Sequence, residues 1–400
     1  MSKKILLCVT GGIAAYKIPA LVRIIIKAGY ELEIIMTREA EKFVSPLVLS
    51  TLAGKKIWLE SDFFSNEYGH EIAHIKLSRW ADLIVIAPCS ANMISKIARG
   101  CADDLMSSAL IASDSPVIIF PAMNENMFNN FFTQENLKLI ARNKNYCIIE
   151  PSAGDLACGT SGRGRMPEPE NIALEIKKAF TQKNLLNKKI LVTAGPTHEY
   201  LDPVRFISNP STGKMGIAMA RAAWYRGADV KIIAGPSINF DPWGFNAVIN
   251  IISAQDMLNS VMDNLSWADY IVKAAAVGDY RAEKIEHQKI KREHKENLTL
   301  NLIENPDIAN EAGKLKRSDQ ILIGFAAETQ NLIENAQNKL TRKNLDYILV
   351  NDVAAKDSGF ASDTNTVRLI ARADKNIQDQ IFSGLKEDVA SNVWDFIASN

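Results

Sequence analysis

The sequence predicts an α/β protein built from two doubly wound, Rossmann-like domains in series. Short, continuously apolar strand segments are followed by glycine turns and amphipathic helices, a pattern typical of parallel sheets that are covered on both faces. The pattern that opens the chain starts again near residue 188. The 400 residues, 47% of them hydrophobic and 23% charged, suffice for two cores of ordinary size.

The first domain, expected over residues 1–187, begins with a strand, a glycine turn and a helix. Apolar residues at helical spacing predict one helix over Ile13–Ala28, which Gly29 ends as a C-terminal cap. A second helix is expected in the segment SANMISKIARG. The predicted strands are Ile5–Val9, Leu32–Met36, Leu83–Ala87 and Val117–Phe120.

The second domain, expected over residues 188–400, repeats this opening. Lys188–Gly195 (KKILVTAG) echoes the residues that lead into Gly11, a helix is expected from about Lys214, and Asp229–Ala234 is the next strand. The polar stretch Thr181–Lys189 is the expected linker. Residues 281–297 are charged and poorly periodic, so we expect a mobile loop there.

Composition excludes several classes of protein. The 46 basic residues balance 46 acidic ones, so the chain has no general attraction for nucleic acid. Five cysteines without a C-x-x-C motif do not make a disulfide framework and fit a reducing compartment. The apolar runs are far shorter than the ~20 residues of a membrane span, and the N-terminus lacks a secretory signal. We therefore expect a cytoplasmic protein that binds neither nucleic acid nor membrane.

Two turns in the first domain could receive an anion. Gly11 and Gly12 follow a strand and precede a helix, where backbone N–H groups and the helix dipole favour phosphate, although the sequence is not G-x-G-x-x-G. Ser90 and Asn92 follow another strand at the edge where open α/β sheets bind ligands. The alternatives are a plain tight turn at the glycines and a helix cap at Ser90.

The segment from His70 to His74 matches the zinc-peptidase signature H-E-x-x-H, with Glu71 at its second position. Zinc would need a third ligand, but Trp80 stands six residues after His74, and no glutamate follows before Glu125. The alternative is that both histidines lie in a surface loop.

Two further segments of the first domain could carry chemistry. Asn124 follows the strand Val117–Phe120 and could hold a carboxylate, or form an Asx-turn that caps the next helix. Gly154–Met166 holds four glycines, two arginines and Cys158. We expect it to be irregular and to act as a lid, the alternative being a disordered tether.

In the second domain, three segments suggest an anionic ligand. The loop from Asp202 to Gly216 brings Ser, Thr, Gly and Lys to a helix start, without the spacing of a P-loop. A strand ends in small residues before Asp279, which would let a planar ligand approach the backbone, and Asp279 itself could hold a metal. Lys289 and its basic neighbours supply positive charge, the alternative being a solvated face.

Taken together and in this order, these segments resemble the bacterial family of bifunctional coenzyme A biosynthesis flavoproteins, phosphopantothenoylcysteine decarboxylase fused to phosphopantothenate–cysteine ligase. The resemblance covers essentially the whole chain, and eight motifs in register make it specific. They are TGGIAAYK, AHIKLSRWADLIVIAPCSANMISK, PAMNENM, ACGTSGRGRM, TAGPTHEYLDPVRFISNPSTGKMG, AAAVGDY, KIKR and GFAAET.

For the first domain the resemblance implies a flavodoxin-like, homo-oligomeric decarboxylase that uses FMN. Its base would be His74, the asparagine that binds the substrate carboxylate would be Asn124, and its proton donor would be Cys158. FMN would oxidise the cysteinyl thiol, so that the carbanion left by CO₂ has an electron sink. The residues implied at the cofactor are Gly11, Gly12, Thr37, Ser90, Asn92 and Met106.

For the second domain the resemblance implies that CTP, with Mg²⁺, activates 4′-phosphopantothenate as an acyl-cytidylate that cysteine then attacks. Asn209, Arg205 and Lys289 would serve the reacting groups, and Asp279 would face the metal. The residues implied at the nucleotide are Lys273, Ala274, Ala275, Asp279, Lys289, Asn305, Pro306, Phe325, Lys339 and Lys343.

Departures from the family pattern are small. Ile72 stands where Met is expected, Phe128 where Trp or Tyr is usual, and Arg292 where Lys is usual, which changes how a phosphate would be gripped. Two rival hypotheses are an FMN-binding regulatory subunit without catalysis and a zinc hydrolase. Retention of His74, Asn124 and Cys158 argues against the first.

Overall fold

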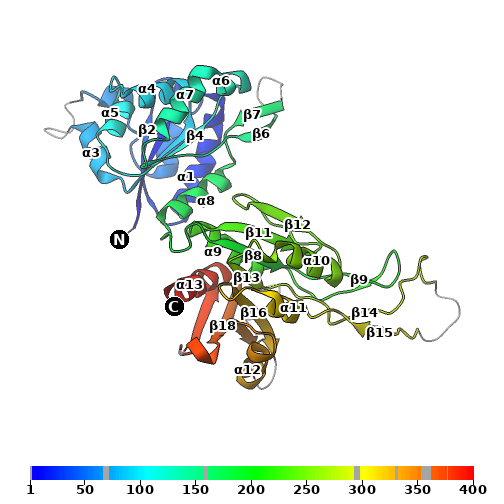
Figure 1. The fold of residues 1–400 in the computed structure, drawn as a ribbon. Coiled ribbons are helices and arrows are strands. Elements are labelled where there is room, and N and C mark those ends of the chain that lie inside the picture. Colours follow the sequence, from blue (N-terminus) through cyan, green and yellow to red (C-terminus); the bar gives the residue numbers. More distant parts are fainter. Residues whose placement is uncertain are drawn as a thin grey trace. The chain divides into compact units, whose positions relative to one another are not determined.

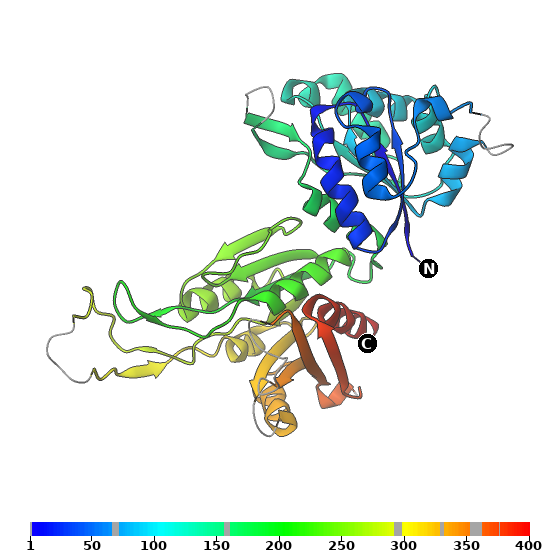
Figure 2. The same cartoon turned by 180° about the vertical axis from the view of Figure 1, so that it is seen from behind.

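In the computed structural model the chain divides into two compact units, residues 1–180 and residues 181–400 (Figures 1 and 2). The structure describes residues 2–65, 72–155, 161–291, 298–328, 332–352, 362–375 and 377–400. Each unit is an α/β sandwich around its own sheet, which confirms the predicted fold class. Among the described residues, no helix is both long and apolar enough to cross a membrane.

The first unit is built on a five-stranded, fully parallel sheet of order β2-β1-β3-β4-β5. Its central strands are buried along nearly their whole length, as continuous apolar runs require. The order is that of flavodoxin-like folds. The strands are β1 (Lys4–Val9), β2 (Glu31–Met36), β3 (Leu83–Cys89), β4 (Val117–Pro121) and β5 (Tyr146–Ile148).

Helices cover both faces of this sheet. Side chains alternate along β1, so Leu7 packs under one helical layer and Leu6 under the other. One layer holds α1 (Ile18–Lys27), α2 (Pro46–Ala53) and α8 (Pro169–Phe180). The other holds α3 (Ala73–Trp80), α4 (Ala91–Arg99), α5 (Leu105–Ile111), α6 (Glu125–Asn129) and α7 (Phe131–Ile140). Short 3₁₀ turns lie at Ile13–Lys17, Ala40–Lys42 and Glu60–Asp62.

The single helix expected over Ile13–Ala28 is interrupted. Residues Ile13–Lys17 form a 3₁₀ turn, and the α-helix starts only at Ile18, with Pro19 in its first turn. Proline has no N–H to donate and is tolerated in a first turn but not in a helix interior, so it sets the start of α1. Gly29, with φ of 82°, follows the helix as predicted.

The glycine-rich segment expected to be irregular is partly a hairpin. β6 (Ser152–Asp155) pairs antiparallel with β7 (Ser161–Arg165), and Cys158 lies outside the described residues between them. The prediction failed because glycines here allow close packing. A Cβ on Gly162 would lie 2.2 Å from Glu125 Oε2, and one on Gly164 would lie 2.2 Å from the Met123 carbonyl oxygen.

The second unit holds an eight-stranded sheet of order β12-β11-β8-β13-β16-β17-β18-β19, parallel up to β17 and antiparallel beyond it. Its first strands repeat the predicted opening at residues 189–194 and 229–234. The strands are β8 (Lys189–Ala194), β11 (Asp229–Ala234), β12 (Ala247–Asn250), β13 (Tyr270–Lys273), β16 (Ile321–Glu328), β17 (Tyr347–Asp352), β18 (Thr364–Ala371) and β19 (Gln380–Leu385).

Two helical layers enclose this sheet as well. On one face lie α10 (Ala254–Leu265), α11 (Ile308–Leu315) and α12 (Leu332–Arg342). On the other lie α9 (Lys214–Tyr225) and α13 (Lys386–Ser399), where the Trp394 indole stacks edge-on against Tyr270 and donates to the Met219 carbonyl at 2.8 Å. A 3₁₀ turn lies at Ala373–Lys375.

Two short antiparallel pairs extend from this unit, β9 (Glu199–Tyr200) with β10 (Phe206–Ile207), and β14 (Tyr280–Ala282) with β15 (Leu302–Glu304) (Figure 1). β14 occupies the start of the segment expected to be a mobile loop. Part of the rest is held by the backbone, since the N–H of Ile290 donates to Asp202 at 3.0 Å and its carbonyl accepts from Arg205 at 2.8 Å. Arg292 lies outside the described residues.

Candidate functional site

The carboxyl ends of β1 and β3 in the first unit are tied together by one threonine. The Thr10 hydroxyl donates to the Pro88 carbonyl at 2.7 Å and accepts from the Ser90 N–H at 2.9 Å. Thr10 is 1% exposed. The turns that carry Gly11, Gly12 and Ser90 therefore form one rigid edge.

The two glycines at this edge have different reasons to be glycine. A Cβ on Gly11 would lie 2.4 Å from the Cβ of Glu39, so only glycine lets the neighbouring chain approach. Gly12 has nothing within 4 Å of such a position and faces open space. Thr37 follows β2 at the same edge, and its hydroxyl accepts from the Ala40 N–H at 3.3 Å.

Ser90 and Asn92 lie at the start of α4. The Ser90 hydroxyl accepts from the Met93 N–H at 3.4 Å, so Ser90 caps the helix, as the alternative interpretation expected. Asn92 is exposed in the first turn of the helix, and Met106 is buried in α5. The cap leaves Ser90 a hydroxyl proton to donate to a ligand, so the two interpretations are compatible.

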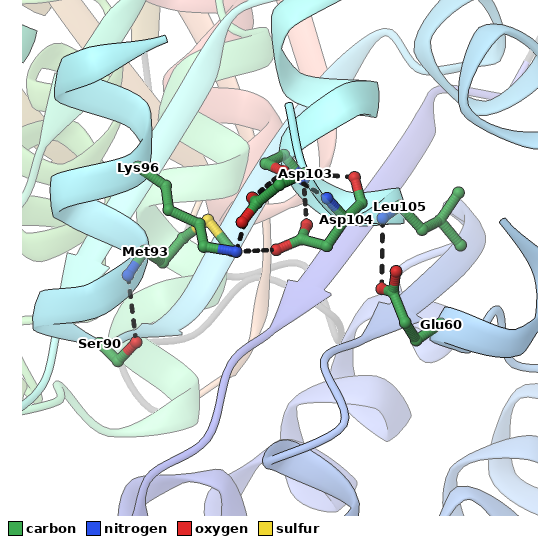
Figure 3. A network of polar contacts seen from close by, with 8 residues as sticks. Glu60, Ser90, Met93, Lys96, Asp103, Asp104 and Leu105 are labelled. Atoms are coloured by element: carbon green, nitrogen blue, oxygen red, sulfur yellow. Dashed lines mark hydrogen bonds and ion pairs between the residues drawn. The ribbon is translucent and has the colours of Figure 1, made fainter. Parts of the chain in front are cut away.

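A charged network fixes the start of α5, the helix that carries Met106 (Figure 3). Lys96 of α4 donates to Asp103 at 2.7 Å and to Asp104 at 2.5 Å, and Asp104 caps α5 by accepting from Ser107. Glu60 accepts from the Leu105 N–H at 3.2 Å. Burial, together with repulsion from Asp104 and Asp103, raises the pKa of Glu60.

His74 stands at the beginning of α3, half-buried beside Phe63. Its Nδ1 is buried and has no hydrogen-bond partner among the described residues. A buried nitrogen without a partner is costly, so this atom is suited to a partner that a ligand or water brings.

The zinc hypothesis requires one continuous helix through the H-E-x-x-H segment, and the structure does not support it. α3 begins only at Ala73, and Ile72 has extended backbone, so the helix that holds His74 does not extend back to Ile72. His70 and Glu71 lie outside the described residues. Among the residues that are described, no group of three or more His, Cys, Asp or Glu side chains could hold a metal ion.

Asn124 caps α6 by accepting from the Asn126 N–H at 2.9 Å, which is the Asx-turn that the sequence left open. The hairpin strand β7 lies against this turn. The Met123 N–H donates to the Gly164 carbonyl at 3.0 Å, and the Arg163 N–H donates to Glu125 at 3.3 Å. The hairpin that flanks Cys158 is thus anchored on both sides of Asn124.

The carboxyl edge of the sheet in the first unit fits a cofactor with a phosphate and a planar ring. Gly12 offers an open backbone before a helical turn, and Ser90 and Thr37 offer hydroxyls from neighbouring strand ends. The unpartnered nitrogen of His74 points to a missing hydrogen-bonding group. The predicted residues Gly11, Gly12, Thr37, Ser90 and Asn124 all follow the carboxyl ends of parallel strands.

The second unit contains a cavity of about 940 Å³ at the carboxyl edge of its sheet. Ten residues that the sequence analysis named line it, although they come from five separate segments. They are Asn209, Lys273, Ala274, Ala275, Asp279, Asn305, Pro306, Phe325, Lys339 and Lys343.

Hydrogen bonds hold the rim of this cavity. The Asn209 amide donates to the Val277 carbonyl at 3.0 Å and to that of Ala276 at 3.3 Å. The Asn305 amide donates to the Gly278 carbonyl at 2.8 Å, while its oxygen accepts from Arg281. The small-residue segment before Asp279 is therefore fixed from both sides.

Asp307 and Lys343 form an ion pair inside the cavity, 2.9 Å apart. Asp307 also caps α11 by accepting from the Asn310 N–H. Burial opposes ionisation of Asp307, but Lys343 and the helix N–H outweigh it and lower the pKa of the carboxyl. Sequence reasoning missed Asp307, although an aspartate directly before an apolar helix is a capping signal.

The cavity extends over the sheet edge to the α9 and α13 face. Lys214 and Lys386 line it there with Asn351 and Asn365. Lys386 is 7% exposed, and burial together with repulsion from Lys214 lowers its pKa. The sequence analysis expected the Ser–Thr–Gly–Lys run at the start of α9, which ends in Lys214, to suit an anion. No local pattern marks Lys386.

Arg205 and Lys289 are not among the residues that line this cavity. Arg205 pairs with Asp202 at 3.0 Å, and Lys289 is exposed beside Ile290. Burial would raise the pKa of Asp202, but N–H donors from Ile290, Val204 and Arg205 lower it. Asp202 therefore links the predicted Arg205 to the segment that carries Lys289.

Comparisons with known proteins agree with this two-part architecture. A family model described as Flavoprotein matches residues 1–181, and one described as DNA/pantothenate metabolism flavoprotein C-terminal domain matches residues 185–400. The Coenzyme A biosynthesis bifunctional protein CoaBC of Bacillus subtilis (strain 168) is 41% identical over 401 residues, covering 100% of this chain and 97% of the relative.

The protein of the same name from Vibrio cholerae serotype O1 is 41% identical over 369 residues, covering 92% of this chain and 91% of the relative. Among solved structures, the C-terminal domain of Coenzyme A biosynthesis bifunctional protein CoaBC is 34% identical, with a TM-score of 0.45, and covers 55% of this chain and 97% of that chain.

Fold and sites define a two-domain α/β flavoprotein whose second domain offers a cationic cavity to a ligand. The chain belongs to the family of bifunctional coenzyme A biosynthesis proteins. The predicted family and the pairing of a flavoprotein decarboxylase with a ligase are thereby confirmed. The boundary between residues 187 and 188 and the roles of individual residues stay predictions.

Proposed function

We propose that this chain catalyses two consecutive steps of coenzyme A biosynthesis. The second unit joins cysteine to 4′-phosphopantothenate, using CTP and an acyl-cytidylate intermediate. The first unit then decarboxylates 4′-phosphopantothenoylcysteine to 4′-phosphopantetheine with FMN. The observation that carries the proposal most strongly is the convergence of ten family-implied residues from five segments on one cavity of about 940 Å³.

In the decarboxylase, His74 would take the proton of the substrate and Asn124 would hold its carboxylate. The unpartnered Nδ1 of His74 supports an interaction with a ligand, and the Asx-turn fixes the direction of the Asn124 side chain. Bound FMN would supply the oxidation that provides a sink for the electron pair that CO₂ leaves on the substrate. Cys158 would return a proton, and its position falls outside the described residues.

FMN itself would be held by the edge that Thr10 stiffens. The backbone at Gly11 and Gly12 and the hydroxyl of Ser90 would face the phosphate. Thr37, Asn92 and Met106 would contact the rest of the cofactor.

In the ligase, lysines from separate segments would offset the charge of the triphosphate. Lys339 and Lys343 line the cavity directly, and Lys289 would act at the phosphate that the substrate carboxylate attacks. Asn209 and Arg205 would hold the acyl-cytidylate. Asp279 lines the cavity and would contact Mg²⁺, which would offset negative charge on the triphosphate.

We also infer that the protein is a cytoplasmic homo-oligomer whose partners are small molecules, with no nucleic acid or membrane among them. The extended pairs of the second unit support self-association, since Val204 and Phe206 are exposed there, as are Leu302 and Ile303. Its substrates would be 4′-phosphopantothenate, cysteine and CTP.

The test uses the purified full-length chain in two assays. A flavin absorption band and release of CO₂ from phosphopantothenoylcysteine would support the decarboxylase. Pyrophosphate release from CTP that depends on 4′-phosphopantothenate would support the ligase. A yellow protein that releases no CO₂ would favour the non-catalytic regulatory subunit. A colourless protein without either activity would reject the proposal.

A further inference from the structure

Lys273 is a buried cationic side chain in the cavity of the second unit. It ends β13, the central strand between β8 and β16, where it lies opposite Gly324. Lys273 is 8% exposed and lines the cavity, so it belongs to the buried wall of the cavity and not to its solvent-exposed rim.

This ammonium group lacks an anionic contact among the described residues. Its hydrogen-bond partner is the Met257 sulfur of α10 at 3.9 Å, which is a weak acceptor. Asp307 is near enough to act on its charge, but the Asp307 carboxylate already binds Lys343 and the start of α11. A buried donor group without a proper acceptor is rare in folded proteins and calls for one from elsewhere.

The surroundings of Lys273 disfavour its charged form, so that the amine exchanges its proton near neutral pH. Burial lowers its pKa to about 7, Asp307 opposes this fall, and Lys343 adds to it. Of the other charged residues that line the cavity, four are cationic and two are acidic. They are Lys214, Lys339, Arg342 and Lys386, and Asp279 and Glu304. An anionic or carbonyl-bearing ligand at this position would stabilise the protonated form.

We propose that Lys273 is a proton-linked binding residue, which takes up a proton when the nucleotide enters and donates a hydrogen bond to an acceptor of that nucleotide. The proposal rests on the CTP-dependent function proposed above and adds a role for this side chain. The acceptor is a carbonyl oxygen or ring nitrogen of the base, or a phosphate oxygen. All three need the same donor.

Proton linkage sets the direction of the pH effect. Below pH 7 the amine is charged with or without ligand, so binding takes up little extra proton. Above pH 7 the free protein holds a neutral amine that must gain a proton in the complex, so affinity falls as pH rises. Between pH 6.5 and 8.5 the Kd for CTP should rise about tenfold more in the wild type than in Lys273→Met.

The experiment is calorimetric titration of the full-length protein with CTP at pH 8.0, in buffers with different ionisation enthalpies. We expect the wild type to take up roughly 0.5 to 1 more proton per CTP than Lys273→Met. Ionisation of CTP itself is common to both proteins and cancels in the difference. The variant Lys273→Arg keeps a permanent positive charge, so it should bind CTP without this extra proton uptake. It therefore distinguishes the effect of the charge on binding from the effect of proton exchange.

Two further titrations identify the acceptor. Extra uptake with cytidine alone assigns the contact to the base, and extra uptake with pyrophosphate alone assigns it to a phosphate. If wild type and Lys273→Met bind CTP with equal proton uptake, the inference is wrong while the proposed function stands. If the wild type does not bind CTP at all, the proposed function itself fails.

Discussion

Both candidate sites lie at the carboxyl edge of a parallel part of a sheet, but their polar side chains make different contacts. In the first unit the side chains of Thr10, Ser90 and Asn124 each form a hydrogen bond with the backbone. In the second unit the cavity is lined by long cationic side chains, among them Lys273 and Lys343. The edge of the first unit is therefore held in place by its own hydrogen bonds, whereas the cavity of the second unit concentrates positive charge.

The difference matches two kinds of ligand. A resident cofactor benefits from a preorganised cradle, because little ordering remains to be done when it binds. A polyanionic substrate that must enter and leave at each turnover benefits from mobile, charged side chains that face an open volume. The same strand–turn–helix opening can therefore serve both purposes, since function depends on the side chains that surround the turn.

The sharpest test of this comparison is the substitution His74→Asn. Loss of a general base typically lowers a rate by about 10²–10⁴, and we expect a fall of that size in CO₂ release. The ligase rate should stay at the wild-type level, because His74 belongs to the first unit. Flavin content is the control. A parallel loss of pyrophosphate release would show that the two sites are coupled.

The matching change in the second unit is Lys289→Gln. A contact made to the developing charge in the transition state is worth about 10²–10³ in kcat, and acyl-cytidylate formation should fall by that factor. The measurement is pyrophosphate release with CTP and 4′-phosphopantothenate. FMN content and decarboxylation should not change. A wild-type rate would assign Lys289 to a solvated face, in keeping with its exposure.

A smaller effect should come from Gly164→Ala. Gly164 has φ of 146°, and a Cβ there would lie 2.2 Å from the Met123 carbonyl oxygen, so β7 must move away from the Asn124 turn. We expect CO₂ release to fall roughly tenfold or more, because a displacement of ~1 Å in a positioning group is costly. The ligase should be unaffected.

Gly100→Ala is the matched control for this change. Gly100 has φ of 67°, with nothing within 4 Å of a would-be Cβ, so the substitution strains the backbone without a clash. It should cost about 1–2 kcal/mol of stability and leave CO₂ release unchanged. Equal activity losses in the two variants would mean that backbone strain alone, rather than the hairpin contact, controls decarboxylation.

Much of the fold could be predicted from the sequence, because the strand, turn and helix patterns of short segments agree with the α/β fold of the whole chain. Asp229–Ala234 was predicted at its observed bounds, and the cap at Gly29 was predicted as well. The helix over Ile13–Ala28 was wrong because apolar spacing outweighed Pro19 in the prediction. The hairpin around Gly162 was missed because glycine content indicated irregularity, whereas its cause is contact with Glu125.

Where a motif marked a segment, the sequence named residues that the structure brings to one edge of a sheet. Asp307 and Lys386 had to wait for the structure, since strand order brings them to the cavity and no local pattern encodes strand order. The burial of Lys273 was equally invisible, because a lysine at the end of a strand is usually solvent-exposed.

The smallest predicted effect is on stability, and it concerns Lys273→Met. Lysine in an unfolded chain has a pKa near ~10.4, whereas burial lowers that of Lys273 to about 7 in the folded protein. Between these values the unfolded chain holds a proton that the folded chain lacks. Folded-state stability is therefore lost as pH falls from ~10.4 to ~7, and methionine removes this loss.

Lys273→Met should thus raise the melting temperature of the ligand-free protein by a few degrees at pH 7, since about 1 kcal/mol shifts Tm by ~2–4 °C in a unit of this size. The gain should shrink toward pH 10, because the unfolded chain also begins to lose its proton as the pH approaches ~10.4. Calorimetric melting at the two pH values is the measurement, and Lys314→Met, an exposed position on α11, is the control. A variant that melts below the wild type at pH 7 would show that Lys273 stabilises the empty cavity. The proposed contrast between the two sites would then not hold for Lys273, because this cationic residue would stabilise the cavity without a ligand.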